Sequence, residues 1–527
     1  MQIREYNKPM EQGGRKISVV KNVAAQMVAA FIQTALGFVV RKLFVVYLTT
    51  ELLGLNGLMQ SIIGMLSIAE LGVGEAINYS LYKPLADGDK EQVNAIMKLY
   101  KKLYVIIAAV IVVLGVAFLP FLGFFIDDGT TQPMSYIYMI YGLFLLDTFL
   151  SYCLAYSRNI ITADQKDYIV TNADTISQIV VTVLQMIILI ITRNYILYLV
   201  IKTVVTFSRN AILHLISQKM HPYTKEKQTV KLSADYIKQL KGNIKALFVT
   251  RISYFIVSGT DNMLLSSFVS LTSVAIYNNY ITILNLLNRT FNTIFDKAKA
   301  GVGNFIAQGE QGKLYELFKN IFFINFLLTS YTTIGLFVVC NELITVWLGK
   351  DFVWSALIVG VLAFNNYSRY ILQTCECFRG AVGLYSPRPF VKYLALLEGI
   401  INLIASISLI YILNDRVLGV FLGTAISTVV STIVVPWIVY KFLFKRPLRE
   451  FFVIYFKYFV VGLITLALSA LVAQLLYIEN HFINMIIGIF ACTVITGAVY
   501  IVVFRKTEEF KYFISLVSGF LKRKNKS

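Results

Sequence analysis

Charged residues are scarce in this chain. Only 15% of its 527 residues are Asp, Glu, Lys or Arg, whereas 57% are hydrophobic, and the mean hydropathy is +0.69. Soluble domains carry about 25% charged residues, which form the hydrated shell that they need. The scarcity of charge therefore excludes the string of soluble domains that the length alone suggests, and it indicates an integral membrane protein.

Histidine and cysteine are also rare, with three and five residues. The histidines, His214, His221 and His481, accompany no nucleophile–base set, and no phosphate-binding loop is present. Cys375 and Cys377 lack a second ligand pair and a nearby histidine. We therefore expect no metal, no cofactor and no enzyme activity.

Basic residues are in excess, and their placement matters more than their number. The net charge is +19, but the Lys and Arg residues stand in short runs between apolar stretches, and no basic nucleic-acid module is apparent. Seven lysines fall in 219–245, whereas the loops on the other side carry only Arg193, Lys350 and Arg416. This bias predicts an even number of spans with both termini cytoplasmic. Residues 1–17 lack the apolar core of a signal peptide. The expected location is a bacterial plasma (inner) membrane.

Apolar runs of the length that crosses a membrane, roughly 20 residues, recur along the chain. The fold expected is all-α with about fourteen transmembrane helices: two six-helix lobes related by pseudo-twofold symmetry, plus a C-terminal helix pair. The expected spans are 19–48, 54–81, 99–126, 134–157, 169–192, 195–218, 245–270, 273–300, 317–347, 352–378, 391–412, 417–441, 451–477 and 482–504. Pro436 predicts an interruption of the twelfth span.

An internal repeat supports this plan. The single shift that aligns Asn22 with Asn243 also aligns Arg158 with Arg379, as well as other loop and helix-end positions, without a gap. The predicted divisions are an N-terminal lobe (1–218), a linker (219–243), a C-terminal lobe (244–441), helices thirteen and fourteen (442–507) and a basic tail (508–527). The linker and the tail carry apolar stripes that favour membrane-surface helices, the alternative being a solvated linker and a disordered tail.

Three stretches carry a resemblance to a known family. They are Gly54–Gly74, which reads GLNGLMQSIIGMLSIAELGVG, with AINYSLYKPLA from Ala76, then VWLG at Val346–Gly349 and GVFLGTAIS from Gly419. The chain resembles O-antigen and capsule-type lipid-linked oligosaccharide flippases of the multidrug/oligosaccharidyl-lipid/polysaccharide exporter superfamily over nearly its whole length. The resemblance implies translocation of an undecaprenyl-pyrophosphate-linked oligosaccharide from the cytoplasmic to the outer leaflet by alternating access. Expected partners are this glycan lipid, membrane lipids and glycan polymerase or assembly proteins, with no nucleic acid.

Ionisable residues inside the spans are the first source of site candidates, since each costs roughly 2.5–3.5 kcal/mol at a helix centre and therefore faces a wet cavity or a partner. The resemblance implies that helices one, two, seven and eight line the central cavity. Among the cations on these helices, we predict Arg41, Arg251 and Arg289 as a pyrophosphate site, because the guanidinium fork matches phosphate oxygens. The alternative for each is a structural ion pair or a snorkelling side chain.

The eighth span is rich in asparagine. Asn278, Asn285 and Asn292 are seven residues apart and share one face, with aromatic residues between them. They are predicted to bind sugar hydroxyls, although helix–helix hydrogen bonding is the competing interpretation.

Two carboxylates lie on the same predicted cavity helices. Glu70 and Asp261 are expected either to couple transport to a proton or sodium gradient or to neutralise arginines. Lys202 and Arg209 form a secondary cationic pair on one face of the sixth span, and Asp147, Asp174 and Arg369 are expected in pairs within the lobes.

Several functions compete. A drug/cation antiporter of the same superfamily should have an acidic cavity, whereas the central charges here lean cationic. A lipid II flippase differs only in its cargo. An integral-membrane glycan polymerase should carry a sizeable external loop, which this chain lacks.

Overall fold

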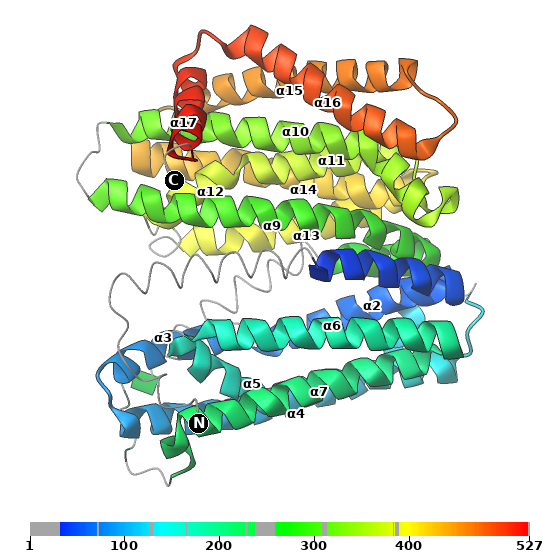
Figure 1. Cartoon of the computed structure of the whole chain (residues 1–527), viewed down its shortest axis with the longest axis vertical. Coiled ribbons are helices and arrows are strands. Elements are labelled where there is room, and N and C mark those ends of the chain that lie inside the picture. Colours follow the sequence, from blue (N-terminus) through cyan, green and yellow to red (C-terminus); the bar gives the residue numbers. More distant parts are fainter. Residues whose placement is uncertain are drawn as a thin grey trace. The chain divides into compact units, whose positions relative to one another are not determined.

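The computed structural model describes residues 32–70, 73–126, 130–164, 166–226, five positions between 230 and 237, 259–307, 313–382, 384 and 389–524. These residues form helices joined by short turns, with no strand among them (Figure 1). They belong to two compact units. The N-terminal unit comprises Met1–Phe124 with Asp128–Arg251, and the C-terminal unit comprises Phe125–Asp127 with Ile252–Ser527.

The N-terminal unit contains mostly long helices, but two shorter ones cover its second span. Its elements are a helix at 32–47, α2 (Thr50–Leu66), the 3₁₀ turn η2 (Ser67–Glu70), α3 (Val73–Ala86), α4 (Lys90–Phe118) with η3 (Leu119–Phe125), α5 (Met134–Ala163), α6 (Asp167–Thr192), α7 (Tyr195–Met220) and η4 (Pro222–Lys225).

The C-terminal unit repeats this succession and adds three helices. Its elements are a helix at 259–268, α9 (Leu271–Ala307), α10 (Leu314–Leu348), η6 (Lys350–Phe352), α11 (Ala356–Ile371), α12 (Gln373–Ala381), α13 (Pro389–Ile412), α14 (Arg416–Val439), the π turn η7 (Tyr440–Phe444), α15 (Leu448–Leu475), α16 (His481–Phe504) and α17 (Glu508–Lys524).

Membrane-spanning character is plain in the described helices. Eight of them are long and apolar enough to cross a membrane, and a shorter apolar stretch covers Leu396–Ile412. The all-α membrane architecture is therefore confirmed. The predicted membrane-surface helix of the linker falls largely outside the described residues. In the tail, α17 forms where the apolar stripe predicts a helix.

Helix boundaries repeat at the predicted offset. The α2–α3 stretch covers Thr50–Ala86, and the shift that takes Asn22 to Asn243 carries its two ends onto Leu271 and Ala307, the ends of α9. The same shift carries Tyr195, which begins α7, onto Arg416, which begins α14. The two halves therefore share one helical plan.

The residues that cap the N-termini of α7 and α14 also correspond between the two halves. Asn194 caps α7 by accepting hydrogen bonds from the Ile196 and Leu197 N–H groups, and Asp415 caps α14 by accepting one from Leu418. A short polar side chain at this position satisfies N–H groups that the first helical turn leaves free. The same local chemistry fixes both helix starts.

The second span differs from the prediction. The pattern predicts one helix over 54–81, but α2 ends at Leu66, a 3₁₀ turn follows at Ser67–Glu70, and α3 begins only at Val73. Hydropathy stays high across this break, so an apolar pattern cannot reveal it. Glu70, at the end of this 3₁₀ turn, accepts hydrogen bonds from two other helices, as described below.

The tenth span is likewise broken rather than continuous over 352–378. α11 ends at Ile371 and α12 begins at Gln373. Asn325 of α10 donates its side-chain amide to the Tyr370 and Ile371 carbonyls at 3.0 and 2.9 Å. A broken helix is tolerated at membrane depth when a neighbour satisfies the freed backbone groups in this way.

Pro436 does not interrupt its helix where it stands. It lies within α14, which continues to Val439 before widening into the π turn at Tyr440–Phe444. Proline removes one intrahelical hydrogen bond without ending the helix. The predicted interruption of the twelfth span at Pro436 is therefore wrong, although a π turn follows the end of α14.

An aromatic core fills the C-terminal unit around α10. Phe326 stacks on Tyr458 of α15 with ring centroids 4.5 Å apart, and Phe323 meets Phe504 of α16 edge-on at 5.2 Å. Phe326 and Phe323 are fully buried. Aromatic pairs contribute about 0.5–1.5 kcal/mol each beyond their buried area. They hold the C-terminal helix pair against the second lobe.

Candidate functional site

Glu70 is the centre of a polar cluster inside the N-terminal unit. Its carboxylate accepts a hydrogen bond from the Tyr104 hydroxyl at 2.7 Å and another from Tyr152 at 3.4 Å. Tyr104 in turn accepts one from Tyr100 at 3.1 Å, and both of these tyrosines are buried. A half-buried carboxylate is thus bound by a chain of hydroxyls from α4 and α5.

The broken helix places Glu70 in this cluster. Glu70 is the last residue of the 3₁₀ turn between α2 and α3. Gly74, in the first turn of α3, allows the tyrosines to approach, because a Cβ there would lie 3.1 Å from the Tyr104 hydroxyl and 3.2 Å from that of Tyr100. A carboxylate held by neutral donors instead of a cation can exchange a proton or bind a small cation.

Asp261 occupies a comparable environment in the C-terminal unit. It lies on the helix at 259–268, is 5% exposed, and accepts a hydrogen bond from the Tyr277 hydroxyl at 2.8 Å. Tyr277 lies against Phe421 and Trp354, with ring centroids 5.1 and 6.3 Å away. Neutralisation by Arg251 or Arg289 is not described, since the side chains of both lie outside the described residues.

The asparagines of α9 divide into two groups. Asn278 exchanges hydrogen bonds with Asn262 at 3.3 and 3.5 Å and also donates to the Val274 carbonyl, as helix-to-helix packing requires. Asn285 and Asn292 are exposed. Of the three predicted sugar ligands, the last two therefore present free amide surface, whereas Asn278 ties two helices together.

Lys202 and Arg209 meet carboxylates within their own lobe. The Lys202 ammonium lies 3.5 Å from Asp147, and Arg209 lies 3.4 Å from Asp174. Arg158 of α5 binds the second oxygen of Asp174 at 2.5 Å. The secondary cations thus belong to a network that joins α5, α6 and α7, in which Asp147 and Asp174 form pairs within the lobe.

The structure describes the three predicted pyrophosphate ligands to different extents. Arg41 is half-buried on the helix at 32–47. Phe44, three residues on, packs against Tyr195 and Tyr198 at the start of α7, with ring centroids 5.4 and 5.5 Å away. Arg251 lies outside the described residues, and for Arg289 only the backbone position within α9 is described. Their joint role stays a prediction.

The tyrosines are the functional residues that sequence reasoning missed. Tyr100 and Tyr104 are four residues apart and so share a helix face, a signal that was available in the sequence. Interface belts account for most membrane tyrosines, however, and only the fold brings α4 to the break at Glu70. In the sequence, Arg158 indicates only a position of the repeat. Its ion pair with Asp174 follows from the packing of α5 on α6.

No metal-binding cluster of His, Cys, Asp and Glu occurs among the described residues. Cys375 and Cys377 of α12 are buried and are not joined in a disulfide. The polar clusters offer carboxylate and hydroxyl oxygens, which suit protons and hard cations better than soft metals.

Comparison with known proteins places this arrangement in a family. A model of the family described as "Polysaccharide biosynthesis protein" matches residues 19–299, more than half of the chain. The chain belongs to this family. The matched region includes the Glu70 cluster, Asp261 and the asparagines of α9. No curated protein matches the chain.

Solved structures share the fold of this member of the family. The lipid II flippase MurJ in an inward closed conformation superposes with a TM-score of 0.64 and 16% identity, covering 90% of this chain and 99% of MurJ. An inward-facing multidrug resistance MATE transporter of the MOP superfamily gives 0.54 and 14%, covering 76% and 92%. A Vibrio cholerae MATE transporter gives 0.54 and 14%, covering 82% and 98%. The chain is a multi-pass membrane protein that shares its fold with these flippase and transporter structures.

Proposed function

We propose that the protein flips an undecaprenyl-pyrophosphate-linked oligosaccharide from the cytoplasmic to the outer leaflet, by alternating access, for the assembly of a cell-surface polysaccharide. The family match over residues 19–299 carries the proposal. It is supported by the transporter fold and by the exposed amides of Asn285 and Asn292 on α9, which suit sugar hydroxyls. The predicted pyrophosphate ligands remain Arg41, Arg251 and Arg289.

The Glu70 cluster is proposed to couple flipping to a proton or sodium gradient. Its carboxylate is bound by the Tyr104 and Tyr152 hydroxyls, so that no cation in the described part of the chain neutralises it. A carboxylate held by neutral hydroxyls is open to an incoming cation, whereas a carboxylate paired with an arginine is already occupied.

The test is flipping of a fluorescent undecaprenyl-pyrophosphate oligosaccharide in proteoliposomes. Arg289→Ala should reduce flipping to the level of empty liposomes, while Arg505→Ala, at an exposed turn after α16, should retain it. Glu70→Gln should lose the response to an imposed ion gradient but keep downhill exchange. The comparison requires matched insertion of all variants.

Two alternatives are outcomes of the same assay. The MurJ-like fold makes lipid II a second cargo to test, and transport of lipid II alone would reassign the substrate. Extrusion of organic cations, with no flipping of any lipid-linked glycan, would instead favour a drug/cation antiporter. Flipping by Arg289→Ala at the wild-type rate would remove the proposed pyrophosphate site.

A further inference from the structure

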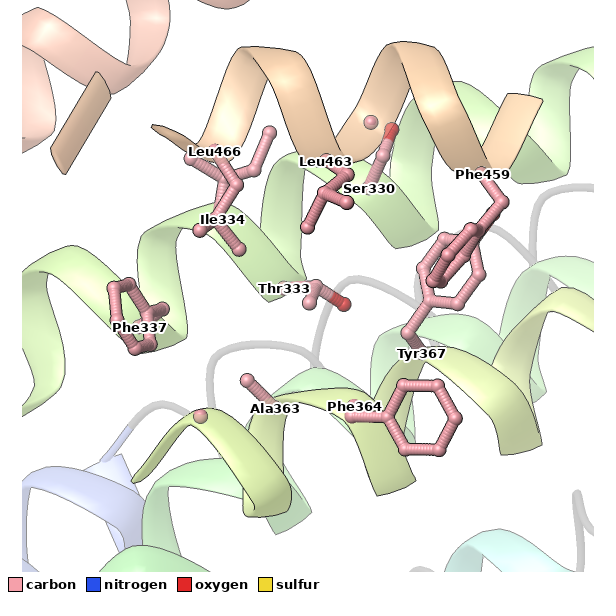
Figure 2. A pocket seen from close by; sticks show the side chains of 12 residues that line it. Ser330, Thr333, Ile334, Phe337, Ala363, Phe364, Tyr367, Phe459, Leu463 and Leu466 are labelled. Atoms are coloured by element: carbon pink, nitrogen blue, oxygen red, sulfur yellow. The ribbon is translucent and has the colours of Figure 1, made fainter. Parts of the chain in front are cut away.

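An apolar groove runs along α15 in the C-terminal unit. One cavity of about 200 Å³ lies between α10, α11 and α15, and its lining includes Thr333, Ala363 and Leu463 (Figure 2). A second cavity of about 430 Å³ lies between α11, α14 and α15. Phe364 and Phe459 line both cavities, so the two adjoin.

The walls of the groove are apolar and accessible from outside. Val429 and Ile433 of α14 are 50% and 45% exposed, and Phe456 of α15 is 56% exposed. The polar residues in the lining of the second cavity, Ser368, Thr432 and Tyr455, carry only hydroxyl groups. In a membrane-spanning chain, such a surface is in contact with hydrocarbon.

A third cavity, of about 420 Å³, lies at one end of this groove and is basic. Its lining includes Trp437, Lys441, Lys445 and Arg446. Ile433 of the apolar cavity and Trp437 of the basic one stand one turn apart on α14, and Phe452 and Leu448 stand one turn apart in the same way on α15. The apolar groove therefore leads into the basic cavity.

The backbone holds these cations at the end of the span. After the π turn, Lys445 adopts a left-handed conformation with φ 55°, and the Arg446 N–H bonds the Tyr440 carbonyl at 3.0 Å. The Lys441 ammonium lies 4.8 Å from the Trp437 ring centre. Tryptophan and basic residues side by side are typical of the level of lipid headgroups.

Only one of the three cations at this end of the groove is paired with a carboxylate in the described part of the chain. Arg446 pairs with Glu450 at 2.9 Å and lies over the Tyr315 ring at 4.1 Å. Lys441 and Lys445 are both exposed, and in the described part of the chain neither forms an ion pair with a carboxylate. Two cations are therefore available to a ligand.

We propose that this groove is a binding site for an anionic phospholipid. The phosphate lies between Lys441 and Lys445, and the acyl chains lie in the two apolar cavities along α15. Basic pockets at the ends of membrane helices bind anionic headgroups for electrostatic reasons. The basic cavity offers no carboxamide or carboxylate side chain for sugars, which favours a phospholipid over the glycan-linked substrate.

The experiment is native mass spectrometry of the full-length protein with phosphatidylglycerol or phosphatidylcholine added in turn. Lys441→Gln/Lys445→Gln should weaken binding of phosphatidylglycerol by about 25-fold, since each lysine near anionic lipid contributes about fivefold in affinity. Phosphatidylcholine binding should not change. The matched control is Lys101→Gln/Lys102→Gln, which removes the same charge from exposed positions of α4.

A second variant tests the apolar part of the groove. Leu463→Trp should occupy the cavity shown in Figure 2 and weaken binding of long-chain, but not short-chain, phosphatidylglycerol; Leu463 is 54% exposed, so the fold should accept the larger side chain. An equal loss in the α4 control would overturn the proposal, because the effect would then be general charge. Displacement of phosphatidylglycerol by stoichiometric undecaprenyl pyrophosphate would also overturn it, in favour of a substrate site.

Discussion

The two halves of the repeat follow the same helical plan but break different helices. The N-terminal half interrupts its second span at Ser67–Glu70, where the C-terminal half has the continuous α9. The C-terminal half interrupts its tenth span at Leu372, where the N-terminal half has the continuous α5. Most other helix boundaries of the two halves agree to within a few residues, so these breaks are local differences between the halves.

One position serves the break in both halves. Tyr104 of α4 and Asn325 of α10 are equivalent under the shift that relates the halves. Tyr104 donates to the Glu70 carboxylate, whereas Asn325 donates to the Tyr370 and Ile371 carbonyls. The first interaction leaves a titratable group at the break, and the second satisfies the backbone. The N-terminal break therefore suits chemistry, and the C-terminal break suits structure.

Helix packing differs in the same way. Gly419 and Gly423 let α14 lie directly against α13, where a Cβ on Gly419 would lie 2.8 Å from the Ile410 nitrogen and one on Gly423 would meet the Ser406 backbone. Under the shift that relates the two halves, Lys202 of α7 is the equivalent of Gly423. In one half the position is a contact between small residues, and in the other it is a charge paired with Asp147.

The largest expected effect on stability comes from changing the side-chain size at these two equivalent positions. Gly423→Leu should force α13 and α14 apart and cost about 3 kcal/mol or more, because backbone atoms cannot move aside as a side chain can. Lys202→Leu should cost about 1 kcal/mol or less, since the pair with Asp147 is partly exposed. Thermal unfolding in one detergent measures both. Equal losses would show that the halves pack alike after all.

The next effect concerns the two breaks. Asn325→Leu should destabilise the protein by about 1–3 kcal/mol, because two carbonyls near a fully buried amide lose their donor. Tyr104→Phe should cost about 1 kcal/mol yet reduce transport, because Glu70 loses its 2.7 Å donor. Unfolding and proteoliposome assays separate the two. A transport defect in Asn325→Leu at matched stability would contradict the division of roles.

A smaller effect is expected from the paired arginines that the repeat aligns. Arg158 bonds Asp174 across helices, whereas Arg379 bonds Glu376 within α12 at 2.8 Å. Asp174→Asn should cost about 1–2 kcal/mol, below the value for a fully buried pair, because it leaves two guanidinium groups without their anion. Glu376→Gln should cost about 0.5 kcal/mol, as for pairs within one helix. Urea or guanidinium unfolding of both variants gives the ranking, which a larger loss in Glu376→Gln would reverse.

The last effect concerns stability at low pH. It comes from a loop contact of Glu51 in the N-terminal half. Burial raises the pKa of Glu51, but hydrogen bonds from Thr130, Thr131 and Gln132 outweigh it and bring the pKa below its usual 4.5. A lowered folded-state pKa stabilises the fold above pH 4.5, and this contribution is lost as the pH falls through the folded value. Glu51→Gln should therefore cost about 1 kcal/mol at pH 7 and progressively less in acid. A stability difference that is constant from pH 7 to pH 3 would refute the hydrogen-bonded carboxylate.

Much of the fold could be predicted from the residues alone. Long apolar runs specify membrane helices because hydrocarbon leaves the backbone no other partner than itself. The constant offset of the repeat anticipated the boundaries of α9 and α14. The linker, Arg251 and the Arg289 side chain lie outside the described residues, so these predictions are still open. Asn278 shows the limit of helical periodicity, since its face is shared with Asn285 but its hydrogen bonds go to Asn262.

By itself, then, the sequence determined the membrane class, the repeat and the candidate charges, because composition and periodicity are local properties of the chain. Only the tertiary structure decided which charges meet. Glu70 lies 34 residues from Tyr104 and 82 from Tyr152 in the chain, and the interruption of the second span is invisible to hydropathy. A carboxylate acquires its partners, and with them its chemistry, only when neighbouring helices pack around it.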